Sequence, residues 1–260
     1  MLSSDTTPNK MVVERHHDFL MQMKRETNLD DIAPSVTEMI QMVVCMMGRG
    51  FKRKICRKTP PNLFFYKVNI ESVKKEKAKY ATGNDWVSTN DILCEWLFTG
   101  LNRSDGLEMV VNLRNRLPQI ETNMAGNYIA SCKVNFIDAH NPKDFRARWT
   151  DIVDGKRPKD VTATVPNFTT NWATFYRELQ IPGLEHHLHL PVLSQEYFWE
   201  VWAGIPMTNQ SYVVIFHLNA EEVGIAVGTY NDVMTEEFFE NSELLAGKVE
   251  PAVFYDKVEL

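Results

Sequence analysis

The pattern of hydrophobic and polar residues predicts helices and strands interspersed along the chain. Ser88–Thr99 has the clearest helical pattern, because Ile92, Leu93, Trp96 and Leu97 lie on one face and Ser88 or Asn90 can cap its start. Helices are predicted at Glu14–Glu26, Val36–Met47, Glu71–Tyr80, Ser88–Thr99, Asn141–Ile152 and Thr235–Leu245.

Apolar runs rich in β-branched and aromatic residues predict extended segments between these helices. They are expected at Asn62–Ile70, Gly106–Leu113, Tyr128–Phe136, Phe168–Phe175, Tyr197–Ile205, Ser211–Asn219 and Gly224–Tyr230. This mixture is typical of an α/β or α+β protein with a mixed sheet. A boundary is predicted at residue 61, between a helical N-terminal segment (1–61), which ends in a basic connection, and a larger region (62–260).

Charge argues against a general nucleic-acid-binding surface. The 260 residues have an ordinary globular composition and a net charge of −6. The basic run Gly48–Lys58 is the local exception, and it suggests either a phosphate contact or a solvated connection. We favour the connection, because neither an aromatic platform nor a glycine-rich phosphate loop accompanies the run.

Cysteine spacing and hydropathy predict a cytoplasmic protein without a membrane span. Cys45, Cys56, Cys94 and Cys132 form no CxxC motif, which favours free thiols in a reducing compartment. The N-terminal segment lacks the apolar core of a signal peptide, and Met39–Met47 is far shorter than the ~20 residues that cross a bilayer.

Histidines provide two weak candidate sites. His186, His187 and His189 offer two metal ligands, but no third ligand is evident nearby, and no metal site is predicted. His16 and His17 precede Asp18, yet side chains of adjacent residues point apart, so a helix surface is the preferred interpretation.

Four motifs, in this order, resemble the C-terminal half of the BAHD-type acyltransferases. This family belongs to the superfamily of chloramphenicol acetyltransferase and the condensation domains of peptide synthetases. The similarity runs from Leu63 to about Asp232, and Glu95 stands where the family usually has a small residue. The matching residues are Ser88, Thr89, Asn90, Asp91, Leu93 and Trp96, then Val111, Asn112, Arg114, Arg116, Leu117 and Pro118, then Met124–Asn127, and finally Thr170, Asn171 and Trp172.

The resemblance implies a fold of two similar α/β lobes with a tunnel between them, of which this chain has the C-terminal lobe and an incomplete N-terminal one. It implies transfer of an acyl group from acyl-coenzyme A, a co-substrate rather than a permanently bound cofactor, to a hydroxyl or amine of a small-molecule acceptor. By resemblance Thr170 and Trp172 lie near the reaction oxyanion. Ser88, Asn90 and Arg114 line the tunnel or the coenzyme A site, while Asp91, Arg116 and Asn127 are structural.

Two family features are missing. No H-x-x-x-D motif, which carries the family's general base, occurs upstream of Ser88, and Gly183–Ser194 replaces a D-F-G-W-G segment. Three hypotheses are therefore open. The first is an acyltransferase lobe that is either a fragment of a longer protein or completed by self-association or a partner chain. The second is a non-catalytic module that binds a ligand or partner, and the third is a small enzyme that uses His16 or His17 as the base.

Overall fold

The structure of the chain is a computed structural model, which describes Ile40, Val44 and residues 62–82, 85–100, 107–112, 114, 129–134, 141–153, 167–176, 211–229 and 234–249. Ile40 and Val44 are helical, as expected within Val36–Met47. The rest of the first two predicted helices, the basic run Gly48–Lys58, the histidine cluster and the strand expected at Tyr197–Ile205 lie outside the described residues.

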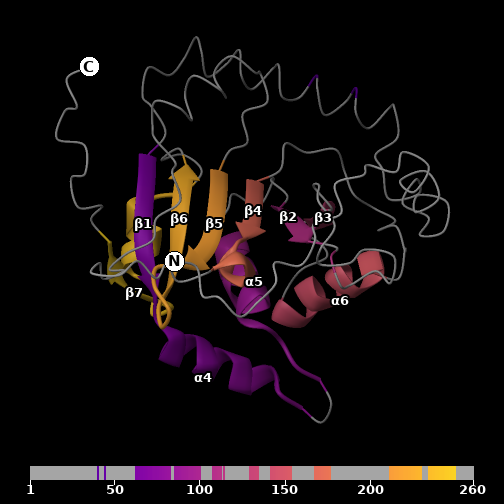
Figure 1. Cartoon of the computed structure of the whole chain (residues 1–260), viewed down its shortest axis with the longest axis horizontal. Coiled ribbons are helices and arrows are strands. Elements are labelled where there is room, and N and C mark those ends of the chain that lie inside the picture. Colours follow the sequence, from indigo (N-terminus) through magenta and orange to yellow (C-terminus); the bar gives the residue numbers. More distant parts are fainter. Residues whose placement is uncertain are drawn as a thin grey trace, which may run out of the picture.

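One mixed sheet organises the described residues. Its seven strands lie in the order β3-β2-β4-β5-β6-β1-β7 (Figure 1). β2, β4 and β5 are parallel to one another, whereas β2–β3, β5–β6, β6–β1 and β1–β7 are antiparallel pairs. The predicted α/β class with a mixed sheet is confirmed. The strands are β1 (Asn62–Val68), β2 (Leu107–Asn112), β3 (Ile129–Val134), β4 (Asn167–Asn171), β5 (Ser211–His217), β6 (Val223–Thr229) and β7 (Leu245–Lys248).

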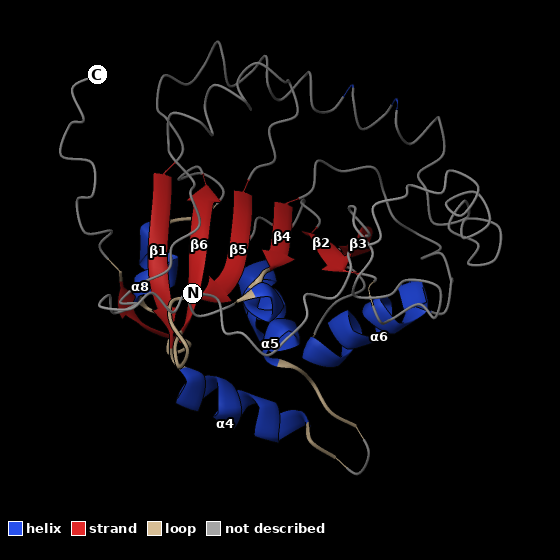
Figure 2. Cartoon of the chain, viewed as in Figure 1, coloured by secondary structure: helices blue, strands red, loops and turns tan. Residues whose placement is uncertain are grey.

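The helices pack on one face of this sheet (Figure 2). Leu93, Phe98, Phe145 and Phe239 are fully buried there against apolar strand residues. A second buried cluster, which includes Phe65, Val214 and Phe216, occupies the opposite face. The helices are α4 (Ile70–Tyr80), α5 (Thr89–Thr99), α6 (Pro142–Val153) and α8 (Glu236–Glu240), and a 3-10 turn, η1 (Ala173–Phe175), follows β4.

Side-chain caps determine where the helices begin. At α6, Asn141 Oδ1 accepts a hydrogen bond from Lys143 N at 2.9 Å, and Asn141 N donates to Asp144 Oδ2 at 3.0 Å. Pro142, the first helical residue, has no N–H to leave unpaired and has a backbone angle suited to a helix. These caps fix the start of α6, which faces the start of α5 across the site described below.

Two predicted elements differ from the observed ones. In place of the helix expected at Thr235–Leu245, the structure has only the short α8. Leu245, the last residue of the expected helix, is the first residue of strand β7. The extended segment expected at Phe168–Phe175 ends at Asn171, where a turn leads into η1. In both places the hydrophobic pattern predicts a longer element. A tight local turn, held by backbone hydrogen bonds, ends the element earlier.

Two negative findings apply to the described residues. None of their helices is long and apolar enough to cross a membrane. No group of three histidine, cysteine or acidic side chains in this part of the chain is arranged to hold a metal ion.

Candidate functional site

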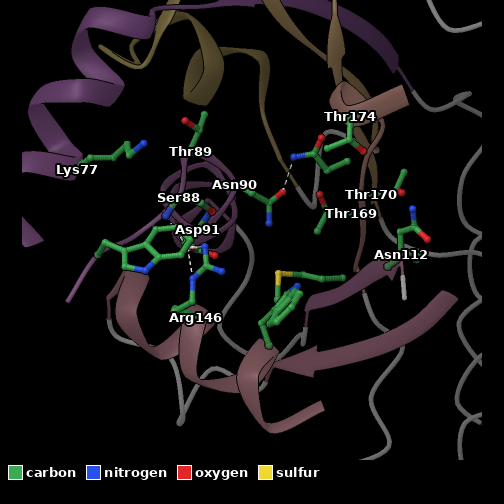
Figure 3. A pocket seen from close by; sticks show the side chains of 15 residues that line it. Lys77, Ser88, Thr89, Asn90, Asp91, Asn112, Arg146, Thr169, Thr170 and Thr174 are labelled. Carbon is green, nitrogen blue, oxygen red and sulfur yellow. Dashed lines mark hydrogen bonds and ion pairs between the residues drawn. The ribbon is translucent and has the colours of Figure 1, made fainter. Parts of the chain in front are cut away.

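A pocket of about 430 Å³ lies where the carboxyl ends of β2 and β4 meet the start of α5 and one side of α6 (Figure 3). Ligand sites in open α/β sheets commonly lie at the carboxyl ends of parallel strands. The lining includes Lys77 from α4, Trp86, Ser88, Thr89, Asn90 and Asp91 at the start of α5, Asn112 from β2, Arg146 and Trp149 from α6, and Thr169, Thr170 and Asn171 from β4.

The start of α5 is fixed by a capping box. Asp91 N donates to Ser88 Oγ at 3.2 Å, and Ser88 N donates to Asp91 Oδ2 at 2.7 Å. The Asp91 side chain is 3% exposed, and Arg146 reaches it from α6, with Nε and Nη2 at 2.9 and 2.5 Å from the same oxygen. Three donors therefore hold a buried carboxylate, and the ion pair joins two helices at the pocket.

The Arg146 guanidinium lies near the rings of Trp86 and Trp149. Its central carbon lies 4.2 Å from the Trp86 ring centroid and 5.9 Å from that of Trp149. Contacts of this kind with aromatic faces are favourable for a planar guanidinium. Arg146 is thus fixed by both charge and stacking, and its charge is matched by that of Asp91.

A chain of amide hydrogen bonds orients Asn90. The N–H of Ala173 donates to Asn171 Oδ1 at 2.9 Å, so the Asn171 amide must present its nitrogen on the other side. Asn171 Nδ2 donates to Asn90 Oδ1 at 3.0 Å. Because Asn90 Oδ1 is thereby occupied, the Asn90 amide nitrogen is turned to the pocket, as Figure 3 shows.

Strand alternation separates Thr169 from Thr170. Thr169 is paired in register with Met109 and Val213, which belong to the cluster under the helices, whereas Thr170 is paired with Val110 and Val214. Val214 belongs to the cluster on the opposite face, and neighbours in register share a face. Thr169 therefore faces α5, and Thr170 contributes to the lining from the other side of the strand.

Thr169 has a buried hydroxyl that is unpaired within the described ranges. The residue is 2% exposed, and its Oγ1 has no hydrogen-bond partner among the described residues. Leaving a buried polar atom unsatisfied costs about 1–3 kcal/mol. Since Thr169 lines the pocket, a bound group can satisfy this hydroxyl.

The pocket contains part of the site predicted from the sequence. Ser88, Asn90, Asp91 and Thr170 all line it. Arg114 lies just beyond β2 outside the lining set, and its backbone N donates to Asn112 Oδ1 at 3.1 Å.

Trp172 follows β4 and is also outside the lining set. Trp172 is 38% exposed, which places it among the exposed large hydrophobic residues. Its backbone N donates a hydrogen bond to Ile215 O at 2.7 Å. The structure thus brings Thr170 to the pocket and leaves the Trp172 side chain at the surface.

Three other predicted residues, His17, Arg116 and Asn127, lie outside the described residues. His217 at the end of β5 is the one histidine that the structure describes, and it is not part of the lining set. Its Nδ1 lies 3.1 Å from Asn219 O. In the described lining, Lys77, Asp91 and Arg146 are the ionisable side chains, so this part of the pocket offers no imidazole base.

Lys77 and Arg146 are charged pocket residues that sequence reasoning missed. Lys77 lies four residues after Val73, the buried residue of α4, so helical spacing already places it on the inner side of a highly charged helix. Arg146 is 55 residues from its partner Asp91, and no local pattern in the sequence indicates that pair.

Solved structures with a similar fold include TRI101, vinorine synthase and an epimerization domain. TRI101 of F. sporotrichioides, crystallised with coenzyme A and T-2, is 13% identical, and the match covers 74% of this chain and 52% of that one with a TM-score of 0.42. Vinorine synthase is 10% identical, with 70% and 46% covered and a TM-score of 0.39. The epimerization domain from the third module of tyrocidine synthetase B is 11% identical, with 90% and 57% covered and a TM-score of 0.41.

The chain spans about half the length of the solved structures that it matches. No protein-family profile matches the sequence, and no curated protein sequence matches it either.

Proposed function

We propose that the chain is an acyltransferase lobe that binds acyl-coenzyme A and supports transfer of the acyl group to a hydroxyl or amine of a small molecule. One observation carries the proposal. Residues from three of the four family-like motifs, including Ser88 and Asn90, Asn112, and Thr170, converge on one pocket although they are far apart in the sequence.

The proposed reaction is nucleophilic acyl transfer. The acceptor oxygen or nitrogen attacks the thioester carbonyl, and a new C–O or C–N bond forms while the acceptor proton passes to a base. Collapse of the tetrahedral oxyanion breaks the C–S bond, and the base returns the proton to the departing thiolate of coenzyme A. No oxidant or metal is required for this balance.

The roles proposed for individual residues follow from the resemblance. Thr170 and Trp172 are proposed as oxyanion donors, and Arg114 as a contact to coenzyme A. His17 is the candidate base within this chain, and the alternative is a base supplied by a partner or by a second copy. A missing base costs about 10²–10⁴-fold in rate.

Two assays test the proposal. Titration calorimetry with coenzyme A measures binding, and release of free thiol from acetyl-coenzyme A in the presence of amine and alcohol acceptors measures transfer. We expect binding by the wild-type chain, and transfer that His17→Ala reduces by at least about 10²-fold. His187→Ala is the control, because it removes a histidine for which no role in transfer is proposed. Absence of both binding and transfer would contradict the proposal.

A second candidate function is ligand binding without turnover. It is favoured by the described lining, where Asp91 and Arg146 neutralise each other and no imidazole is present. In that case coenzyme A or another ligand binds, no thiol is released with any acceptor, and His17→Ala changes nothing.

A further inference from the structure

We propose that His217 is a binding residue for the acyl acceptor, and that its Nε2 accepts a hydrogen bond from an O–H or N–H group of that molecule other than the group that is acylated. The inference rests on the proposed function and deepens it, because it names the class of acceptor. That class is a small molecule with two hydrogen-bond donors, such as an amino alcohol, a diol or a diamine. The base that takes the acceptor proton is a separate group.

A backbone contact fixes which nitrogen of His217 carries the proton. Nδ1 lies 3.1 Å from the carbonyl oxygen of Asn219. Because a carbonyl oxygen only accepts, Nδ1 carries the proton and donates it, and Nε2 of the neutral ring keeps its lone pair. No donor among the described residues contacts Nε2. The imidazole therefore presents a hydrogen-bond acceptor whose partner can be a ligand.

The sheet places His217 close to the wall of the pocket. β4 and β5 are parallel, and Asn171, the last residue of β4 and part of the lining, is paired in register with Ile215. His217 lies two residues further along β5, on the face that Ile215 shares with the cluster under the helices. Strand spacing and rise place the Cα atoms of Asn171 and His217 roughly 8 Å apart.

The η1 turn connects His217 with the pocket. Thr174, in the middle of η1, lines the pocket (Figure 3), and Tyr176 directly follows the turn. The Tyr176 and His217 rings have centroids 5.2 Å apart and an interplanar angle of 35°. His217 is only partly buried, so a ligand can reach it. A ring that is already held by Tyr176 and Asn219 loses little freedom when a ligand binds.

The pocket itself offers a substrate mainly donors. The side-chain oxygens of Asn90, Asn112 and Asn171 already accept hydrogen bonds, and the Asp91 carboxylate accepts from Arg146. The donor hydrogens of an acyl acceptor need acceptors of their own, because an unpaired polar group weakens binding. The imidazole Nε2 provides such an acceptor at the same edge of the sheet.

The position of His217 also suits the arrangement of the two substrates. A molecule as large as acyl-coenzyme A takes up a pocket of about 430 Å³, so the acceptor must approach from beside it. β5 is the neighbour of β4 on the side away from β2. A group that contacts His217 there lies several bonds from the reacting atom, which is why we infer an acceptor with two separate donors.

Nuclear magnetic resonance tests the tautomer without any turnover. Long-range proton–nitrogen spectra of protein labelled at histidine distinguish a protonated ring nitrogen from one with a lone pair, and the signals missing in His217→Asn belong to His217. In mildly alkaline solution we expect a protonated Nδ1 and an unprotonated Nε2. A ring protonated at Nε2 would overturn the inference, because it has no lone pair there to offer.

Kinetics with matched acceptors test the contact. Amino alcohols and alkylamines of equal chain length differ in the second donor only. We expect the wild type to acetylate the amino alcohols with a kcat/KM about five- to tenfold higher, through a lower KM for the acceptor. His217→Asn keeps a donor for Asn219 O but has no acceptor in the place of Nε2, so the preference should disappear while the KM for acetyl-coenzyme A stays unchanged.

Two further variants separate binding from folding. His217→Gln places an amide oxygen near the position of Nε2 and should recover part of the preference. Glu221→Gln changes an exposed side chain in the turn that follows β5 and should behave as the wild type does. Melting temperatures of all three variants show whether the fold is kept. A preference for amino alcohols that His217→Asn leaves intact would overturn the contact.

The outcomes distinguish this inference from the proposed function. Transfer without any preference for amino alcohols supports the function and overturns the role of His217. If no acceptor releases thiol, the wild type is titrated with the same compounds in the presence of coenzyme A, and the His217 Nε2 signal is followed. A shift with the amino alcohols but not with the alkylamines then supports the binding site and removes only the proposed transfer. No shift with either overturns the site as well.

Discussion

Asn171 donates its side-chain amide to Asn90 Oδ1 over 3.0 Å and so connects the end of β4 with the first turn of α5. The two residues are 81 positions apart in the sequence. Because Asn171 also accepts from Ala173 N, the contact transmits a fixed orientation to Asn90. The oxygen and the nitrogen of the Asn171 side chain are both hydrogen-bonded, so Asn171 determines that Asn90 turns its nitrogen, and not its oxygen, to the pocket.

Asn171→Asp is expected to reverse that polarity without unfolding the protein. The introduced carboxylate still accepts from Ala173 N, and the Asn90 amide can rotate so that its nitrogen donates to the second carboxylate oxygen. The oxygen of Asn90 and the new carboxylate then face the pocket, and binding of coenzyme A, which is an anion, should fall by at least about tenfold. Titration calorimetry with coenzyme A measures this loss.

Asn171→Ala is the matched variant for stability. It leaves Ala173 N and Asn90 Oδ1 without their partner, so the free energy of unfolding should fall by about 1–2 kcal/mol. Asn171→Asp should lose less than Asn171→Ala in urea unfolding. Equal losses for the two variants would show that the amide chain does not orient Asn90.

Arg146→Ala is expected to destabilise the protein strongly. It leaves the Asp91 carboxylate, 3% exposed, without its cation, and removing one partner of a buried pair costs about 3–5 kcal/mol. The stacking on Trp86 is lost as well. Urea unfolding monitored by circular dichroism measures the change in the free energy of unfolding.

Lys143→Ala is the control for the Arg146 experiment, because it removes another cation from the same helix. Lys143 pairs with Asp85 at 3.1 Å, but both side chains are well exposed, at 39% and 68%. An exposed pair contributes about 0–1 kcal/mol, so this variant should remain near wild type. Similar losses for Lys143→Ala and Arg146→Ala would mean that burial does not set the strength of the Asp91 pair.

Local signals in the sequence predicted much of the fold. The apolar runs of β5 and β6 are buried over most of their length, and the Ser88–Asp91 spacing of a capping box marked the start of α5. β7 was missed because it is short, mostly exposed and contains Gly247, and it becomes a strand through pairing with β1. That pairing joins segments too far apart for local periodicity to detect.

The candidate site was predictable only where its parts are local. Asn90 and Asp91 were found because they belong to the helix start, but the role of Thr169 depends on which face of β4 meets α5. The sequence places Thr169 and Thr170 side by side, and only the register with β2 and β5 assigns them to opposite faces. The Arg146 contact likewise requires α6 to pack against α5.

Gly100→Ala is expected to destabilise the end of α5 by overpacking. A Cβ atom at Gly100 would collide with Cζ of Phe238, whose ring stacks on Trp96 with centroids 5.1 Å apart. The ring must move, which in a packed core typically costs about 1–3 kcal/mol. The thermal unfolding midpoint of the variant should fall accordingly.

A second substitution identifies the cause of that loss. Phe238→Leu shortens the obstructing side chain, so Gly100→Ala should cost less in the Phe238→Leu background than in the wild type. If the cost is the same in both backgrounds, contact with Phe238 is not the reason for the loss.

Tyr66 is expected to make stability depend on pH in the alkaline range. Its hydroxyl is buried without a partner in the described residues, and burial, with smaller contributions from Glu236 and Glu240, raises its pKa from 10.0 to about 12. Since the folded state holds this proton more tightly, the stabilisation is complete below pH 10 and is lost as the pH rises toward 12. By pH 11 the loss should be about 1.4 kcal/mol, one pKa unit of linkage.

Tyr66→Phe isolates this contribution, because other tyrosines and lysines titrate in the same range. The ring stacks on Phe239 at 5.4 Å, and phenylalanine preserves that contact while it removes the buried hydroxyl. At pH 8 the variant should therefore be as stable as the wild type or more stable. Urea unfolding at pH 8, 9, 10 and 11 should show the difference between variant and wild type growing with pH in favour of the variant, and a constant difference would show that Tyr66 does not titrate abnormally.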